Sequence, residues 1–187
     1  MDLISRIKRN HGLEHATIHV LSEKHKNFSA QGNSTPNGFH LNIYGNISET
    51  DVIEAVEEAY TRMKAGEHNL AVHPNCGTVL LTTAVLVTLA AQAVFAVEQK
   101  KRKRSSMSLP VFANALPTAI LAVVGALIVS RPLGVQLQAR YTVEGDLGNL
   151  QVVRIRQVNA SPITRLFQVM LTGGQQQATS YKITTTG

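Results

Sequence analysis

The chain has 187 residues, of which 44% are hydrophobic and only 16% are charged. Residues 71–97 and 109–130 contain no Asp, Glu, Lys or Arg, whereas residues 98–108 carry five basic side chains and one acidic one. These charge-free runs of 27 and 22 residues match or exceed the roughly 20 apolar residues that a helix needs to cross a bilayer, which argues against a freely soluble globule. The single cysteine excludes an internal disulfide.

The net charge of +6 is concentrated beside the apolar runs. The chain has no Trp, and aromatic residues make up only 5% of it, so we expect no nucleic-acid partner. A lipid bilayer is the expected partner of the apolar runs, and anionic lipid is the expected contact of the basic run Lys100–Arg104.

Residues 1–77 are predicted to form an α/β domain consisting of a helix, a β-hairpin and a second helix. No cleavable signal is expected, because no apolar core follows the first basic residues. Apolar residues recur at three- and four-residue spacing over residues 2–24, which predicts an amphipathic helix. Residues 27–31 and 39–44 flank a run of turn formers and predict the hairpin. Ser48 and Asp51 form a capping-box pattern before a helix that ends at Gly66, and residues 70–72 predict a short strand.

Residues 78–130 are predicted to form a transmembrane helical hairpin, with spans at 79–97 and 109–129 and a basic loop at 98–108. Because basic loops stay on the cytoplasmic side, this loop is expected to be cytoplasmic and both flanking parts to face the opposite side. The expected location is the bacterial cell membrane, as a multi-pass protein with two spans.

Residues 131–187 are predicted to form a β-rich tail. Apolar and polar residues alternate over residues 135–144, which is the period of a strand. Further strand-like runs occupy residues 150–158, 163–171 and 180–185, separated by turn residues. The expected fold is therefore an α/β N-terminal domain, a two-helix transmembrane hairpin and this tail.

Histidines are concentrated on the predicted first helix. His11, His15 and His19 follow one another at four-residue spacing, which places them along one face. The run from His11 to His15 reads H-x-x-E-H, the inverted zincin pattern, in which two imidazoles bind a divalent metal and the Glu acts on its water. The alternative is a polar helix face that pairs with Glu57 or Glu58 on the second helix.

A catalytic site of this type needs a third protein ligand and an open fourth position. Cys76 is the natural candidate, because thiolate binds zinc well and the residue lies in a Pro- and Gly-containing turn. His73 competes for the same role, with His19 and His68 behind it. Alternatively, Cys76 is a small apolar residue at a helix entrance, and His73 caps the following helix.

The H-x-x-E-H helix, the hairpin, the second helix and the Cys76 turn together resemble the metal site of S-ribosylhomocysteine lyase and of the inverzincin-type metallohydrolases. This resemblance implies a compact metallohydrolase-like domain over residues 1–77, with His11, His15 and Cys76 as ligands and Glu14 as general base. The runs His11–Leu21 and Leu70–Thr78, with the basic hairpin, also resemble an uncharacterised family of small bacterial two-span membrane proteins.

The sequence therefore predicts a membrane-anchored, metal-dependent hydrolase that acts on peptide or protein substrates. Zinc is the expected metal, with iron as the alternative. The rival hypothesis is a non-catalytic metal-binding membrane protein, an assembly factor or sensor, with a closed structural site. The third hypothesis is an interaction module that binds no metal. Substrate and oligomeric state are not predicted.

Overall fold

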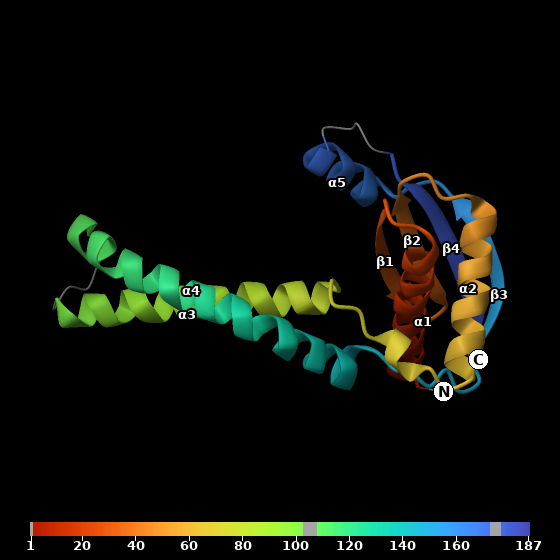
Figure 1. Cartoon of the computed structure of the whole chain (residues 1–187), viewed down its shortest axis with the longest axis horizontal. Coiled ribbons are helices and arrows are strands. Elements are labelled where there is room, and N and C mark those ends of the chain that lie inside the picture. Colours follow the sequence, from red (N-terminus) through yellow and green to blue (C-terminus); the bar gives the residue numbers. More distant parts are fainter. Residues whose placement is uncertain (1, 103–107, 173–176) are drawn as a thin grey trace. The chain divides into compact units, whose positions relative to one another are not determined.

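The computed structural model describes residues 2–102, 108–172 and 177–187 (Figure 1). The chain forms two compact units, Met1–His73 with Thr142–Gly187, and Pro74–Tyr141. The expected combination of a mixed α/β part and two apolar helices is confirmed. Residues 103–107, which belong to the predicted basic loop and include Lys103 and Arg104, lie outside the described residues.

Helix α1 (Leu3–Lys24) is the long N-terminal helix that the apolar spacing predicts. It buries Leu13, Val20 and Leu21 completely. A glycine normally weakens a helix interior by roughly 1 kcal/mol relative to Ala, but the packing of α1 requires glycine at position 12. A Cβ at this position would lie 2.6 Å from the backbone oxygen of Glu144, so only glycine admits this close approach.

Strands β1 (Ser29–Thr35) and β2 (Gly38–Tyr44) form the predicted hairpin. Thr35 pairs with Gly38, so the connection is shorter than the turn-rich sequence suggests. Gly38 has φ +129°, a conformation that L side chains rarely adopt, and the site for a Cβ there is filled by the Ile183 carbonyl. The turn therefore requires glycine on both counts.

Helix α2 (Glu49–Lys64) begins at the predicted capping box. The Ser48 hydroxyl accepts from the backbone N–H of Asp51, and the Asp51 carboxylate accepts from the backbone N–H of Ser48. These two bonds satisfy N–H groups that a helix start otherwise leaves without intrahelical partners. The helix buries Val52, Val56 and Met63 against the core.

Replacing Ser48 by Ala should lower the free energy of unfolding by about 1 kcal/mol, because the variant loses the hydroxyl that accepts from the Asp51 N–H and donates to the Asp51 carboxylate. Denaturant titration of the detergent-solubilised full chain, followed by circular dichroism, measures this loss. Ser22→Ala is the matched control, since Ser22 is an exposed serine near the end of α1 that caps no helix. An equal loss in both variants would contradict the capping assignment.

Strand β3 (Gln151–Val158) lies within the predicted strand-like run 150–158, and β4 (Thr179–Thr186) extends the predicted run 180–185 by one residue at each end. They join the hairpin in one antiparallel sheet of order β1-β2-β4-β3, so the C-terminal residues complete the sheet of the first unit. Helices α1 and α2 cover one face of this sheet (Figure 1). The core between them includes Leu13, Val20, Phe39, Leu41, Val56, Met63, Tyr181 and Ile183.

Two short segments differ from the prediction. Residues 163–171, predicted as a strand, belong to helix α5 (Pro162–Thr172). The backbone N–H of Thr164 donates to the Ser161 hydroxyl at 3.1 Å, so Ser161 caps the helix and Pro162 occupies its first position, where proline is favoured. Residues 70–72, also predicted as a strand, lie in and just after the 3₁₀ turn η1 (His68–Ala71).

The second unit consists of α3 (Gly77–Lys101) and α4 (Leu109–Leu137), both longer than the predicted spans. The predicted strand at 135–144 is wrong, because α4 runs on to Leu137 and continues as the π-helical segment η2 (Gln138–Thr142). A short alternation of apolar and polar residues does not by itself exclude a helix when it directly follows the apolar residues of a long helix.

The two long helices pack against each other through small and hydroxyl side chains. The hydroxyl of Thr83 donates to that of Ser130 at 2.9 Å, and Gly134 lets α4 approach Val79 closely. Phe95 and Phe112 stack with ring centroids 5.8 Å apart. Small interfacial residues and interhelical hydroxyl bonds are typical of helices that pack within a membrane.

Candidate metal centre

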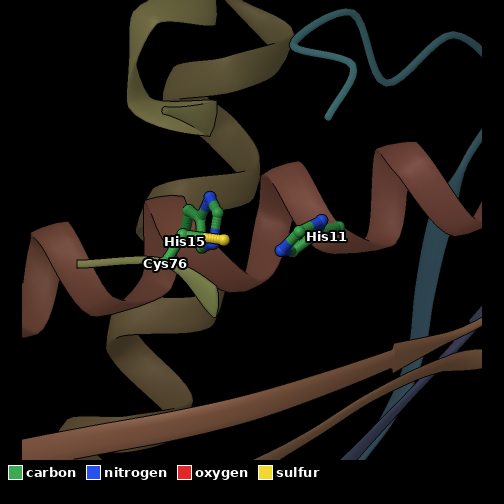
Figure 2. A group of neighbouring side chains, drawn as sticks. All are labelled: His11, His15 and Cys76. Atoms are coloured by element: carbon green, nitrogen blue, oxygen red, sulfur yellow. The ribbon is translucent and has the colours of Figure 1, made fainter. Parts of the chain in front are cut away.

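The sequence motif places two imidazoles on one face of α1, one turn apart. His11 is partly buried and His15 is 3% exposed. Their ring centroids lie 4.4 Å apart, and Figure 2 shows both side chains leaving the helix on the same side. Two nitrogen donors are therefore already close together without any rearrangement of the helix.

Backbone carbonyls fix the tautomer of both rings. Nδ1 of His11 lies 2.9 Å from the Thr142 carbonyl oxygen, and Nδ1 of His15 lies 2.7 Å from that of Ala71. A carbonyl oxygen only accepts, so each Nδ1 carries the hydrogen and each Nε2 carries the lone pair. Metal-binding histidines almost always donate their second ring N–H to a carbonyl, carboxylate or water in this way.

An ion pair holds the segment that supplies the Thr142 carbonyl against α1. The Glu144 carboxylate accepts from the Arg9 guanidinium at 2.8 and 2.9 Å and from the Ser5 hydroxyl at 2.8 Å. The backbone N–H of Glu144 also donates to the Lys8 carbonyl at 3.1 Å. Sequence reasoning missed these contacts, because they join residues more than 130 positions apart.

Cys76 is the N-cap residue of α3 and lies three positions after His73, where the first segment of the first unit ends. It is 8% exposed, and its Sγ accepts from the backbone N–H of Thr78 at 3.5 Å. The predicted turn thus ends in a helix start that positions the sulfur. This position agrees with the alternative prediction that Cys76 lies at the entrance of a helix. It does not prevent the sulfur from acting as a metal ligand.

The ligand atoms of His11, His15 and Cys76 all lie within 4.8 Å of one another, so this cluster can hold a metal ion. Figure 2 shows the sulfur of Cys76 beside His15 and directed toward His11. Two imidazoles and one thiolate are the donors that zinc prefers, and thiolate also suits iron. The arrangement supplies three protein ligands.

His73 and His19 lie next to this cluster. The ring centroid of His73 is 5.7 Å from that of His15 and 4.9 Å from that of His19. Burial, reinforced by the neighbouring His19 and His15, lowers the pKa of His73 to about 4, so its imidazole is neutral at physiological pH. Nε2 of His19 donates to the Val72 carbonyl at 2.9 Å, which gives this ring the opposite tautomer to His11 and His15.

Glu14 is 4% exposed and faces strand β1. Its carboxylate accepts from the Ser34 hydroxyl at 2.6 Å, and it fills the space where a Cβ of Gly32 would stand. A side chain at residue 32 would displace the carboxylate, so Gly32 and Ser34 together position it. Sequence reasoning missed both residues, because they lie in a stretch whose composition indicates only a turn.

The alternative pairing of the histidine face with the second helix does not match the ion pairs of Glu58. Its carboxylate lies 2.9 Å from Lys24 Nζ and 3.6 Å from the Arg62 guanidinium. Glu57 is exposed on the same helix. Glu58 therefore belongs to the charge network between α1 and α2 rather than to the histidine face.

Comparison with known proteins shows the family of this chain. The model of the family described as domain of unknown function DUF6391 matches residues 6–155, which include all three residues of the cluster. The chain belongs to this family. An uncharacterised protein of Picosynechococcus sp. is 39% identical over 89 residues, which cover 43% of this chain and 42% of the relative. The chain thus spans about two fifths of that relative's length. No solved structure matches the chain.

Proposed function

We propose that His11, His15 and Cys76 bind one zinc ion and that the protein is a membrane-anchored, zinc-dependent hydrolase. The observation that carries the proposal is the 4.8 Å cluster, in which both imidazoles donate Nδ1–H to backbone carbonyls. Such preset tautomers are expected of a pair of metal-binding histidines.

Zinc bound by three protein ligands keeps a fourth position open, polarises a carbonyl group and lowers the pKa of its water to about 7. Glu14 would accept a proton from the attacking water and return it to the leaving group. Helix geometry supports this role, since Glu14 lies about 60° from His11 and about 100° from His15 around the helix axis. Ser34 would hold the carboxylate in one orientation by its 2.6 Å bond.

Membrane anchoring by α3 and α4 is part of the proposal. Both helices are long and apolar enough to cross a membrane, and only 6% and 17% of their apolar windows are buried within the protein. Exposed apolar surface of this extent needs a covering, and lipid is the covering that such helices suit. The basic residues around 98–108 favour the cytoplasmic side for that loop.

Peptide bonds are the proposed target. The test uses the full chain in lipid nanodiscs, loaded with zinc and incubated with a quenched fluorescent peptide library, with products identified by mass spectrometry. We expect cleavage that a zinc chelator abolishes and that added zinc restores. A zinc-loaded protein that leaves every peptide intact would contradict the peptidase proposal.

A closed, non-catalytic site is the second candidate, and the neutral ring of His73 beside His15 favours it. Replacing zinc by Co²⁺ separates the two, because the cobalt absorption spectrum reports the number and type of ligands. If His73 completes the site, His73→Ala will change that spectrum and lower metal affinity. An unchanged spectrum in this variant supports the open, catalytic site.

A further inference from the structure

The face of the sheet opposite α1 and α2 carries an unusual row of basic side chains. Residues with odd numbers on β2 and β4, such as Leu41 and Ile183, are buried in the core, so the alternate residues point to the other face. The register places His40 opposite Lys182, and Lys182 opposite Arg156. Arg154 stands two residues from Arg156 and, like it, is exposed.

Among the residues that the structure describes, these cations form no ion pair. The ion pairs found among the described residues involve α1, α2, α3 and the Glu144 segment, and none includes Arg154, Arg156 or Lys182. The pKa of His40 is lowered, first by burial and then by Lys182 and Arg156. The field at this face is therefore positive and uncompensated.

Helix α5 lies at the edge of the same face. The Asn42 side-chain amide donates to the Thr164 hydroxyl at 3.5 Å, and the Ser180 hydroxyl donates to Asn42 Oδ1 at 2.6 Å. Leu166, Val169 and Met170 of α5 are 59%, 62% and 71% exposed. Large apolar side chains thus extend into solvent beside a row of cations.

We propose that this docking face, defined as Arg154, Arg156, Lys182 and the exposed side chains of α5, binds an anionic lipid bilayer. The cations would contact phosphate headgroups while Leu166, Val169 and Met170 enter the interface. A soluble polyanion would contact the cations but would leave the exposed apolar side chains of α5 in water. The inference rests on the proposed anchoring, since α3 and α4 would keep the first unit beside the bilayer.

The absence of Trp from the chain allows a clean reporter. The variant Val169→Trp introduces one indole on α5, and the full chain is reconstituted in proteoliposomes of phosphatidylcholine alone or with added phosphatidylglycerol. We expect a blue-shifted emission and quenching by brominated lipid in the anionic vesicles. High salt should reverse both signals, because the headgroup attraction is screened.

The charge requirement is tested in the same background. Replacing Arg154, Arg156 and Lys182 by Gln should weaken docking roughly a hundredfold, since each cation near an anionic surface contributes about a fivefold factor. The matched control replaces Lys24, Lys26 and Lys64 by Gln, which removes the same charge from the α1 and α2 side. Equal loss in both triple variants, or quenching that ignores lipid charge, would overturn the proposal.

Two further outcomes are decisive. An indole that stays in water in every vesicle overturns the proposal. Binding of a polyanion such as heparin at this face, without binding of anionic lipid, also overturns it. Resistance of the protein to carbonate extraction is measured on the same samples. Its loss shows that the anchoring has failed, whereas retained anchoring without indole burial overturns the docking face alone. Zinc content reports separately on the metal proposal.

Discussion

Replacing Glu14 by Gln is expected to lower zinc-dependent peptide cleavage roughly a hundredfold to ten-thousandfold while leaving bound zinc unchanged. The amide keeps the size of the carboxylate and still accepts from Ser34, so the packing against Gly32 is preserved. It cannot accept a proton at neutral pH. Initial rates on a cleaved library peptide, together with elemental analysis of the same sample, measure the two quantities.

The matched control is Glu23→Gln, which removes one carboxylate from the exposed surface of α1. Its cleavage rate and zinc content should equal those of the unmodified protein. Loss of zinc in Glu14→Gln would make Glu14 part of the scaffold of the site. A full cleavage rate in that variant would remove Glu14 from the mechanism.

Replacing His15 by Ala is expected to abolish zinc binding, so that bound zinc falls from about one ion per chain to almost none. His11→Ala and Cys76→Ala should behave alike, since the proposed site has three protein ligands. For the unmodified protein, zinc at a hundredfold excess over Kd should raise the free energy of unfolding by about 2.7 kcal/mol, and the variants should lose this gain.

His40→Ala is the control for these ligand variants, because His40 is also partly buried yet lies on the opposite face of the sheet. It should bind zinc and gain stability from it as the unmodified protein does. Circular dichroism identifies any variant that has lost its fold. A folded His15→Ala protein with full zinc content would contradict the site.

Local signals explain why much of the fold follows from the sequence. Composition alone identifies α3 and α4, because apolar helices of membrane-crossing length need few other cues. The Ser48–Asp51 box locates the start of α2 through contacts three residues apart. The four-residue spacing of His11 and His15 follows from the helix period, so their common face was predictable.

One local cap and two non-local contacts explain what sequence reasoning got wrong or missed. Residues 163–171 alternate only loosely, and the capping bond of Ser161 decides in favour of a helix. Gly12 weakens a helix in isolation, and its reason is visible only once the Glu144 carbonyl is seen beside it. The pairing of β4 with β2 joins segments far apart in the chain, which no local pattern records.

The sequence by itself determined the residue types of the candidate metal centre, two imidazoles on one helix face and a cysteine at a helix start. The tertiary structure alone decided that their ligand atoms lie within 4.8 Å and that the carbonyls of Thr142 and Ala71 hold each Nδ1 hydrogen. Every residue except proline has the same backbone donor and acceptor, so the residue types do not indicate which backbone carbonyl will accept from a given imidazole. The tertiary structure alone determines which carbonyl faces which imidazole.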